Sequence, residues 1–233
     1  MLALRIYAHW DAPLMIKAIF FDLDGTLLDR DASIKHFITT QYDRLTPLKK
    51  ITKTEYVSRF IELDCRGHVW KDKVYQTIVS EFGLKTISWE ELLDDYETQF
   101  IHSCIPFPNL VETLDILTTQ GYLLGIITNG LGTFQKRTIQ GLGIEKYFQT
   151  ILISEVEKVR KPEAEIFLRA LRNLGVTPDE SVFIGDHPDA DVMGAKRIGM
   201  KSIWKRDLGW QDPENPDGII DNLGNLPLML QSL

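Results

Sequence analysis

The sequence predicts an α/β fold, a Rossmann-like parallel sheet sandwiched by helices, with an inserted all-helical domain. Short apolar runs rich in Ile, Val and Phe recur along the chain, and each ends at a polar residue or Gly. Such runs are typical of parallel strands buried on both faces. Stretches with helical spacing of apolar residues separate them, except at one place where about a hundred residues intervene.

Five apolar runs are expected to form strands, and a sixth is weaker. The five lie at residues 16–21, 123–127, 150–153, 181–184 and 201–204, and the sixth at 218–220. Apolar residues recur at helical spacing between them, within 110–117, 166–174 and 192–198. This alternation of strand and helix predicts a parallel sheet with helices packed on it.

The segment between the first two strands is far longer than an ordinary connection in an α/β unit. From residue 30 to 104 it has helical periodicity and no convincing buried strand. The polar turn at 29–31 and the stiff Pro106-Phe107-Pro108 border it. We therefore expect a helical domain at 30–105 and a core formed by 15–29 and 106–233. Residues 1–14 show no clean period and are interpreted as an N-terminal extension.

Composition and charge exclude several classes of protein. The 233 residues carry a net charge of -7, which is the wrong sign for a protein held on nucleic acid or an anionic membrane by a general field. The two cysteines form no zinc or disulfide pattern. No apolar run approaches the roughly 18 residues of a membrane span. The cytoplasm is the expected location.

Polar clusters follow the strands where each strand ends. In an open parallel sheet the ligand crevice lies beyond these carboxyl ends, so we expect the clusters to converge there. The clusters are D-x-D-G-T at 22–26, T-N-G at 128–130, a Lys-Pro pair at 161–162 and G-D-x-x-x-x-D at 185–191.

The carboxylates in these clusters oppose one another's ionisation. Each pair of like charges at 4 Å costs about 4 kcal/mol at an effective dielectric constant of 20. A divalent cation would resolve this repulsion, and a set of oxygen ligands favours Mg²⁺ over a softer metal. We therefore expect Mg²⁺ as a cofactor.

The motifs, taken in order, resemble the haloacid dehalogenase superfamily, in its branch with a helical cap inserted after the first motif. The resemblance covers nearly everything from Ile16 onward. It implies a phosphatase that acts on a small phosphorylated metabolite through an aspartyl-phosphate, with Mg²⁺; the charge and the lack of an apolar span already argue against nucleic acid or membrane partners. The implied metal ligands are the carboxylates of Asp22 and Asp186, the backbone carbonyl of Asp24, and Asp191 either directly or through water.

The resemblance also implies a role for each catalytic candidate. Asp22 would be the nucleophile, and Asp24 the general acid and base. The Thr128 hydroxyl and the Asn129 amide would hold the phosphoryl oxygens. Lys161 would supply a fixed positive charge that stabilises the transition state.

A cluster of cationic, titratable and aromatic side chains stands out within the inserted segment, between residues 65 and 73. We expect a loop between two cap helices here. The resemblance implies that such a loop selects the leaving group, so Arg66, His68, Trp70 and Lys71 are candidates for substrate contact. His187 is a further candidate at the rim of the site. Sugar phosphates, nucleotides, flavin phosphate and phosphorylated small acids all stay open as substrates.

Three alternative functions share parts of this pattern. A phosphomutase of the same fold would have all four clusters and would differ in how slowly water attacks the phospho-enzyme. A dehalogenase of the superfamily attacks carbon and lacks the acid two positions after the nucleophile, whereas Asp24 is present here. A receiver-like phospho-acceptor module also groups Asp, Thr and Lys at strand ends, but is about half as long and has no helical cap.

Overall fold

A six-stranded parallel sheet forms the centre of the structure, a computed structural model that describes residues 15–233. The predicted extension at 1–14 lies outside the described residues. The strand order is β3-β2-β1-β4-β5-β6, and every adjacent pair is parallel. The strands are β1 (Ala18–Phe21), β2 (Leu123–Thr128), β3 (Thr150–Ile153), β4 (Ser181–Gly185), β5 (Lys201–Lys205) and β6 (Gly218–Ile220). The predicted fold class is confirmed, and the first strand begins two residues later than expected.

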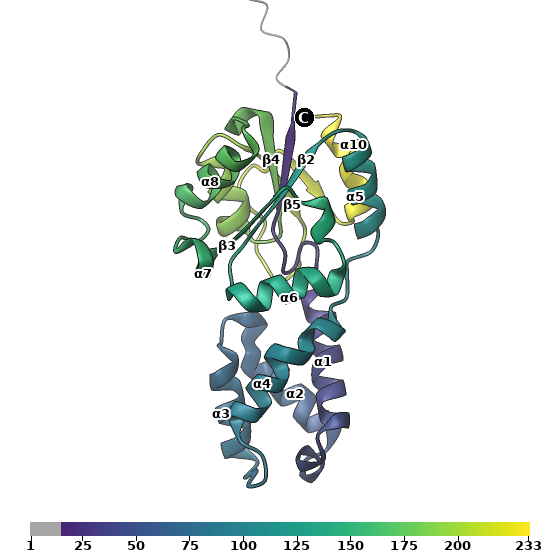
Figure 1. Ribbon diagram of the computed structural model, residues 1–233, viewed down its shortest axis with the longest axis vertical. Coiled ribbons are helices and arrows are strands. Elements are labelled where there is room, and N and C mark those ends of the chain that lie inside the picture. Colours follow the sequence, from purple (N-terminus) through teal and green to yellow (C-terminus); the bar gives the residue numbers. More distant parts are fainter. Residues whose placement is uncertain (1–14) are drawn as a thin grey trace, which may run out of the picture.

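Helices cover both faces of this sheet (Figure 1). The side chains of β1 alternate between the faces, so Phe21 joins one apolar cluster and Phe20 the other. The first cluster includes α5 (Leu110–Thr119), α6 (Gly132–Leu142) and α10 (Leu226–Leu230). The second includes α8 (Ala164–Leu174) and α9 (Gly194–Lys196). A short helix, α7 (Ser154–Glu157), follows β3.

The helix expected around 192–198 is not a regular α-helix. Its first part is a π-helical turn, Pro188–Met193, which continues directly into the short α9. The wider turn brings Asp191 back towards the end of β4, where the backbone N–H of His187 donates to its Oδ2 at 3.0 Å. π-helical turns are frequent at functional sites.

The inserted segment is a bundle of helices with an apolar core of its own (Figure 1). It contains α1 (Arg30–Arg44), α2 (Lys53–Asp64), α3 (Lys71–Glu81) and α4 (Trp89–Gln99), followed by the 3₁₀ turn Phe100–Ser103. The polar turn expected at 29–31 is the start of α1, because Asp29 Oδ1 accepts from the Ala32 N–H at 3.0 Å. We propose that residues 30–105 form a cap domain.

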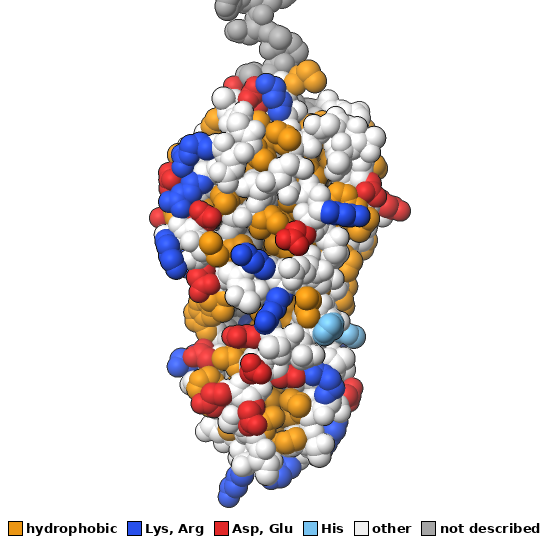
Figure 2. All heavy atoms as spheres, in the orientation of Figure 1, with side chains coloured by type: hydrophobic (Ala, Val, Ile, Leu, Met, Phe, Trp, Pro, Cys, Tyr) orange, Lys and Arg blue, Asp and Glu red, His pale blue; other side chains and the backbone are white. Residues whose placement is uncertain are grey.

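The cap lies across the end of the sheet where the strands reach their carboxyl ends. Strand β1 is central, with β2 and β4 on either side, and the chain passes to one side for β2 and β3 before it returns for β4. The carboxyl end of β1 is therefore a topological switch point, where α/β sheets form their ligand crevices. On the face drawn in Figure 2, cationic and acidic side chains are interspersed.

One buried glutamine links all four helices of the cap. Gln41 of α1 is fully buried, and its Oε1 accepts from Tyr56 of α2 at 2.7 Å and Tyr75 of α3 at 3.0 Å. Its Nε2 donates to the Leu92 carbonyl at 3.1 Å and to Asp95 Oδ2 at 2.9 Å, both in α4. A buried polar network that is satisfied in this way fixes how the helices are arranged.

We expect Gln41→Leu to lower the free energy of unfolding by about 2–5 kcal/mol, because two buried hydroxyls lose their acceptor. Urea unfolding measures the loss. Replacing Tyr56 and Tyr75 with Phe in the Gln41→Leu background should restore part of the stability, since the unpaired hydroxyls are then gone. A Gln41→Leu protein as stable as the parent would show that this network does not stabilise the cap.

Candidate active site

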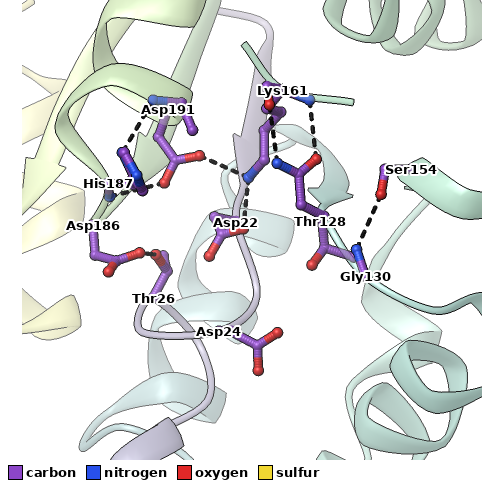
Figure 3. Close-up of polar contacts among 12 residues, drawn as sticks. Asp22, Asp24, Thr26, Thr128, Gly130, Ser154, Lys161, Asp186, His187 and Asp191 are labelled. Atoms are coloured by element: carbon purple, nitrogen blue, oxygen red, sulfur yellow. Dashed lines mark hydrogen bonds and ion pairs between the residues drawn. The ribbon is translucent and has the colours of Figure 1, made fainter. Parts of the chain in front are cut away.

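Three buried carboxylates and one buried ammonium meet at the ends of the central strands (Figure 3). Oxygen atoms of Asp22, Asp186 and Asp191 lie within 4.8 Å of one another. Lys161 Nζ donates to Asp22 Oδ1 at 2.6 Å and to Asp191 Oδ1 at 2.7 Å. The structure thus brings together four of the predicted site residues: Asp22 directly after β1, Asp186 directly after β4, Asp191 in the turn that follows, and Lys161 in the segment after β3.

The charges of this cluster do not balance. If all four groups are ionised, one ammonium leaves two of the three negative charges uncompensated. Burial raises the pKa of Asp22 well above its ordinary value, Asp191 and Asp186 raise it further, and Lys161 opposes them. Burial, followed by Asp191, raises the pKa of Asp186 to about 7. Burial lowers the pKa of Lys161, but Asp191 and Asp22 outweigh it and raise that pKa overall.

The donor set fits a hard divalent cation. Three carboxylates within reach of one point offer the oxygen ligands that Mg²⁺ prefers. The +2 charge of such an ion would also cancel the excess negative charge. It would thereby lower the free-energy cost of burying these carboxylates.

Two glycines make the close approach of the carboxylates possible. Gly25 has φ +88°, and a Cβ there would lie 2.6 Å from Asp186 Oδ2. A Cβ on Gly185 would collide with the Asp191 carboxylate. Any side chain at either position would push a carboxylate out of the cluster.

Asp24 lies apart from the cluster, and its carboxylate does not reach Lys161 (Figure 3). Gln135 of α6 holds it, with Nε2 donating to Asp24 Oδ2 at 2.6 Å and to the Thr128 hydroxyl at 2.9 Å. Gln135 is buried, and its Oε1 has no hydrogen-bond partner among the described residues. Gln135 was not among the residues predicted from the sequence, because nothing local distinguishes it from the other polar residues of α6.

The Asn129 side chain is engaged with the backbone of Lys161. Its Oδ1 accepts from the Lys161 N–H at 2.9 Å, and its Nδ2 donates to the Lys161 carbonyl at 3.0 Å. This pair of bonds positions Lys161. The predicted contact of Asn129 with phosphoryl oxygens stays a prediction, and Asn129 does line the cavity above Asp22.

Two adjoining cavities open between the cap and the sheet. The first, of about 260 Å³, contains the carboxylates and Lys161, and Arg66 and His68 also line it. The second, of about 470 Å³, is lined by Trp70 and Lys71. The four cap residues grouped by the sequence analysis are therefore divided between two cavities. The loop expected between two cap helices is present, between α2 and α3.

The cap loop meets the chain after β5 at Trp210. Arg66 forms an ion pair with Asp207 and lies 5.5 Å from the Trp210 ring centre. The indole Nε1 of Trp210 donates to Asp186 Oδ2 at 3.1 Å, and its ring packs on His187 with centres 4.4 Å apart. Trp210 was not among the predicted site residues, because the polar clusters recognised in the sequence precede β5 and Trp210 follows it.

A family model described as haloacid dehalogenase-like hydrolase matches residues 19–205. The chain belongs to this family. The resemblance stated from the motifs is thereby confirmed.

Relatives of this haloacid dehalogenase-like hydrolase include a glyceraldehyde 3-phosphate phosphatase from Methanopyrus kandleri, 30% identical, with 89% of this chain and 92% of the relative covered. A phosphatase structure from Thermococcus onnurineus has a TM-score of 0.65 and 31% identity, covering 92% and 98% of the two chains. A 2-haloacid dehalogenase structure from Pseudomonas syringae has a TM-score of 0.67 and 30% identity, covering 94% and 99%.

The predicted enzyme class, a phosphatase-like hydrolase, is confirmed by the family match and the curated relatives. The receiver-like alternative does not fit a chain that matches this family. Among the described residues, none of the helices has the length and apolar character needed to cross a bilayer.

We expect Gly185→Ala to displace Asp191 and so weaken Mg²⁺ binding by about 10- to 100-fold, the range typical of a disturbed metal surrounding. Calorimetric titration with Mg²⁺ measures the change. Gly83→Ala in the cap is the control for backbone strain: its φ of +58° disfavours any side chain, but a Cβ there meets nothing within 4 Å and so displaces no carboxylate. Equal Mg²⁺ affinity in the Gly185→Ala and parent proteins would show that Asp191 is not one of the metal ligands.

Proposed function

We propose that the protein is a Mg²⁺-dependent phosphatase that releases inorganic phosphate from a small phosphorylated metabolite through an aspartyl-phosphate on Asp22. The observation that carries this proposal is the pairing of Asp22 with Lys161 inside a cluster of excess negative charge, while Asp24 stands apart. In this arrangement Asp22 is available as the nucleophile and Asp24, outside the cluster, as the acid. The similarity to phosphatases also supports the proposal.

The residues that would hold Mg²⁺ are the carboxylates of Asp22, Asp186 and Asp191 and the backbone carbonyl of Asp24. Bound there, the ion would offset the charge of the phosphoryl oxygens and let an anionic nucleophile approach an anionic ester. Trp210 and the Gly25 turn keep the Asp186 carboxylate in place.

The chemistry divides between the two carboxylates of the first motif. A carboxylate oxygen of Asp22 attacks phosphorus, the bond from phosphorus to the leaving oxygen breaks, and Asp24 gives that oxygen a proton. Water then attacks the aspartyl-phosphate and returns a proton to Asp24, which frees Asp22 and inorganic phosphate. Thr128, Asn129 and Lys161 stabilise the phosphoryl oxygens in both steps.

The dehalogenase and phosphomutase alternatives differ from the phosphatase in the leaving group, the atom attacked or the fate of the phospho-enzyme. Asp24, held at 2.6 Å by Gln135, favours an ester oxygen that needs a proton over a halide that needs none. Halide release from 2-haloacids tests the dehalogenase alternative. A phospho-enzyme that water attacks slowly and that requires a bisphosphate activator would favour the phosphomutase.

We expect Asp22→Asn to lower phosphate release by at least about 10³-fold, because the amide keeps the shape but is not a nucleophile. Chelation of Mg²⁺ should abolish release in the parent, and Ca²⁺ should restore little of it, since Ca²⁺ coordination is larger and looser. A phosphate-release assay and circular dichroism measure activity and fold. Full activity in a chelator would contradict the proposal.

We expect Asp24→Asn to slow phosphoryl transfer from alkyl esters by about 10²- to 10⁴-fold, the usual contribution of a general acid. Transfer from p-nitrophenyl phosphate should fall less, because its leaving group needs little protonation. Single-turnover kinetics isolates this first step from hydrolysis of the intermediate. Equal losses for both esters would count against the acid role of Asp24.

A further inference from the structure

A tight turn after β5, formed by residues 207–210, lies between the cap and the carboxylate cluster. The Trp210 N–H donates to the Asp207 carbonyl at 3.1 Å and closes the turn. The Gly209 N–H donates to Asp207 Oδ1 at 2.7 Å, so the turn also fixes this carboxylate. Asp207 and Trp210 both line the cavity of about 260 Å³ that contains the cluster. The turn is therefore part of the wall of the candidate active site.

The 207–210 turn holds the guanidinium of Arg66, which belongs to the cap. Asp207 Oδ2, the oxygen that Gly209 leaves free, forms the ion pair with Arg66. The same guanidinium lies 5.5 Å from the Trp210 ring centre, within the range of a cation–π contact. A Cβ on Gly209 would collide with the guanidinium, so glycine leaves the room that it occupies. Three features of the turn thus fit one side chain of the cap.

Exposure to water limits the strength of this contact. The Arg66 and Asp207 side chains are 39% and 22% exposed, and ion pairs this accessible stabilise a structure only weakly. The cation–π contact adds a further small contribution. The contact can therefore bias the position of the turn without fixing the cap permanently to the core. A bias of this size changes an equilibrium constant about two- to fivefold.

The indole nitrogen of Trp210 reaches the carboxylate cluster. Its Nε1 donates to Asp186 Oδ2 at 3.1 Å. Among the described residues one other side chain, Thr26, donates to this carboxylate, at 3.5 Å and so at the limit of a hydrogen bond. The Asp186 carbonyl is fixed separately by the buried indole of Trp204 at 2.6 Å. Loss of the Trp210 donor would therefore free the carboxylate while the backbone stays in place.

The Trp210 ring is bounded by the core and by the cap. On the core it packs on His187, whose Nδ1 accepts from two backbone N–H groups of the π-helical turn. On the cap His68 packs edge-on against it with ring centres 5.9 Å apart, beside Arg66. A shift of the cap loop would remove the His68 and Arg66 contacts and leave the His187 contact. The orientation of the indole is thus supported in part by the cap.

We propose that Trp210 is a positioning residue for Asp186 and that the cap supports it through Arg66, so that docking of the cap strengthens Mg²⁺ binding. The inference rests on the Mg²⁺ site of the proposed function. It assigns Arg66 to docking of the cap, in place of the substrate contact expected from the sequence. By thermodynamic linkage, Mg²⁺ at Asp186 strengthens the docking of the cap by the same factor.

Positioning and charge predict opposite effects when Arg66 is lost. A nearby cation repels Mg²⁺, so removal of its charge would by itself strengthen Mg²⁺ binding. Gly209→Ala separates the two effects, because the added Cβ displaces the guanidinium and removes no charge. The φ angle of Gly209 is not positive, so alanine needs no left-handed backbone there.

Calorimetric titration with Mg²⁺ measures both steps of the coupling. We expect Trp210→Phe, which keeps a ring and loses the donor, to weaken Mg²⁺ binding about tenfold or more. Gly209→Ala should weaken it about two- to fivefold. Leu208→Ala is the control, because this side chain of the same turn is 94% exposed, and its Mg²⁺ affinity should equal that of the parent.

A double variant tests whether the effect of the cap passes through the indole. In the Trp210→Phe background, Gly209→Ala should cause no further loss of Mg²⁺ affinity, since the hydrogen bond that it disturbs is already gone. Circular dichroism checks that each variant is folded. Losses that add in the double variant would overturn the proposal, and so would a Gly209→Ala protein that binds Mg²⁺ as tightly as the parent or more tightly.

Phosphate release distinguishes failure of this proposal from failure of the proposed function. If the parent releases phosphate with Mg²⁺ and Gly209→Ala leaves Mg²⁺ affinity unchanged, the role of the cap is wrong and the proposed function stands. If the expected losses of affinity are found but no phosphate is released, the coupling stands and the phosphatase proposal is wrong. A parent protein that does not bind Mg²⁺ would overturn both.

Discussion

Three carboxylates buried around a single ammonium are the constraint on which the rest of this structure depends. Charges this close repel one another by several kcal/mol in a medium of reduced dielectric constant, so their positions must be enforced by the backbone. The central place of β1 between β2 and β4 brings Asp22 and Asp186 to one edge of the sheet. The π-helical turn adds Asp191, and Asn129 fixes the backbone of Lys161 beside them.

The sequence predicted the sheet well because parallel strands are buried on both faces. Continuous apolar runs such as those of β1 and β4 are then the local signature of the strand itself. The carboxylates could be predicted for a related reason, since a polar residue that directly follows such a run lies at the edge of the sheet. Asp22 and Asp186 could be predicted without knowledge of distant contacts, because each directly follows a strand.

The rest of the site depends on contacts that leave no local pattern. Gln135 lies on a helix whose polar residues look alike in sequence, and only the packing of α6 shows that this one reaches Asp24. The cap loop looked like one cationic unit, but Cys65 and Arg66 have positive φ angles of 49° and 55°. The chain turns sharply there, which directs Arg66 and Lys71 to different cavities.

The two chain crossings between cap and core lie side by side. They are hydrogen-bonded to each other, with the Asp29 N–H donating to the Ile105 carbonyl at 2.8 Å and the Phe107 N–H to the Leu27 carbonyl at 3.0 Å. Arg30 follows the first crossing directly and lines both cavities. Under the proposed function, a substrate that contacts the cap as well as Lys161 of the core would draw the two parts together. Such a substrate would also exclude water from the aspartate cluster, so cap contacts that select the leaving group would at the same time protect the proposed phosphoryl transfer.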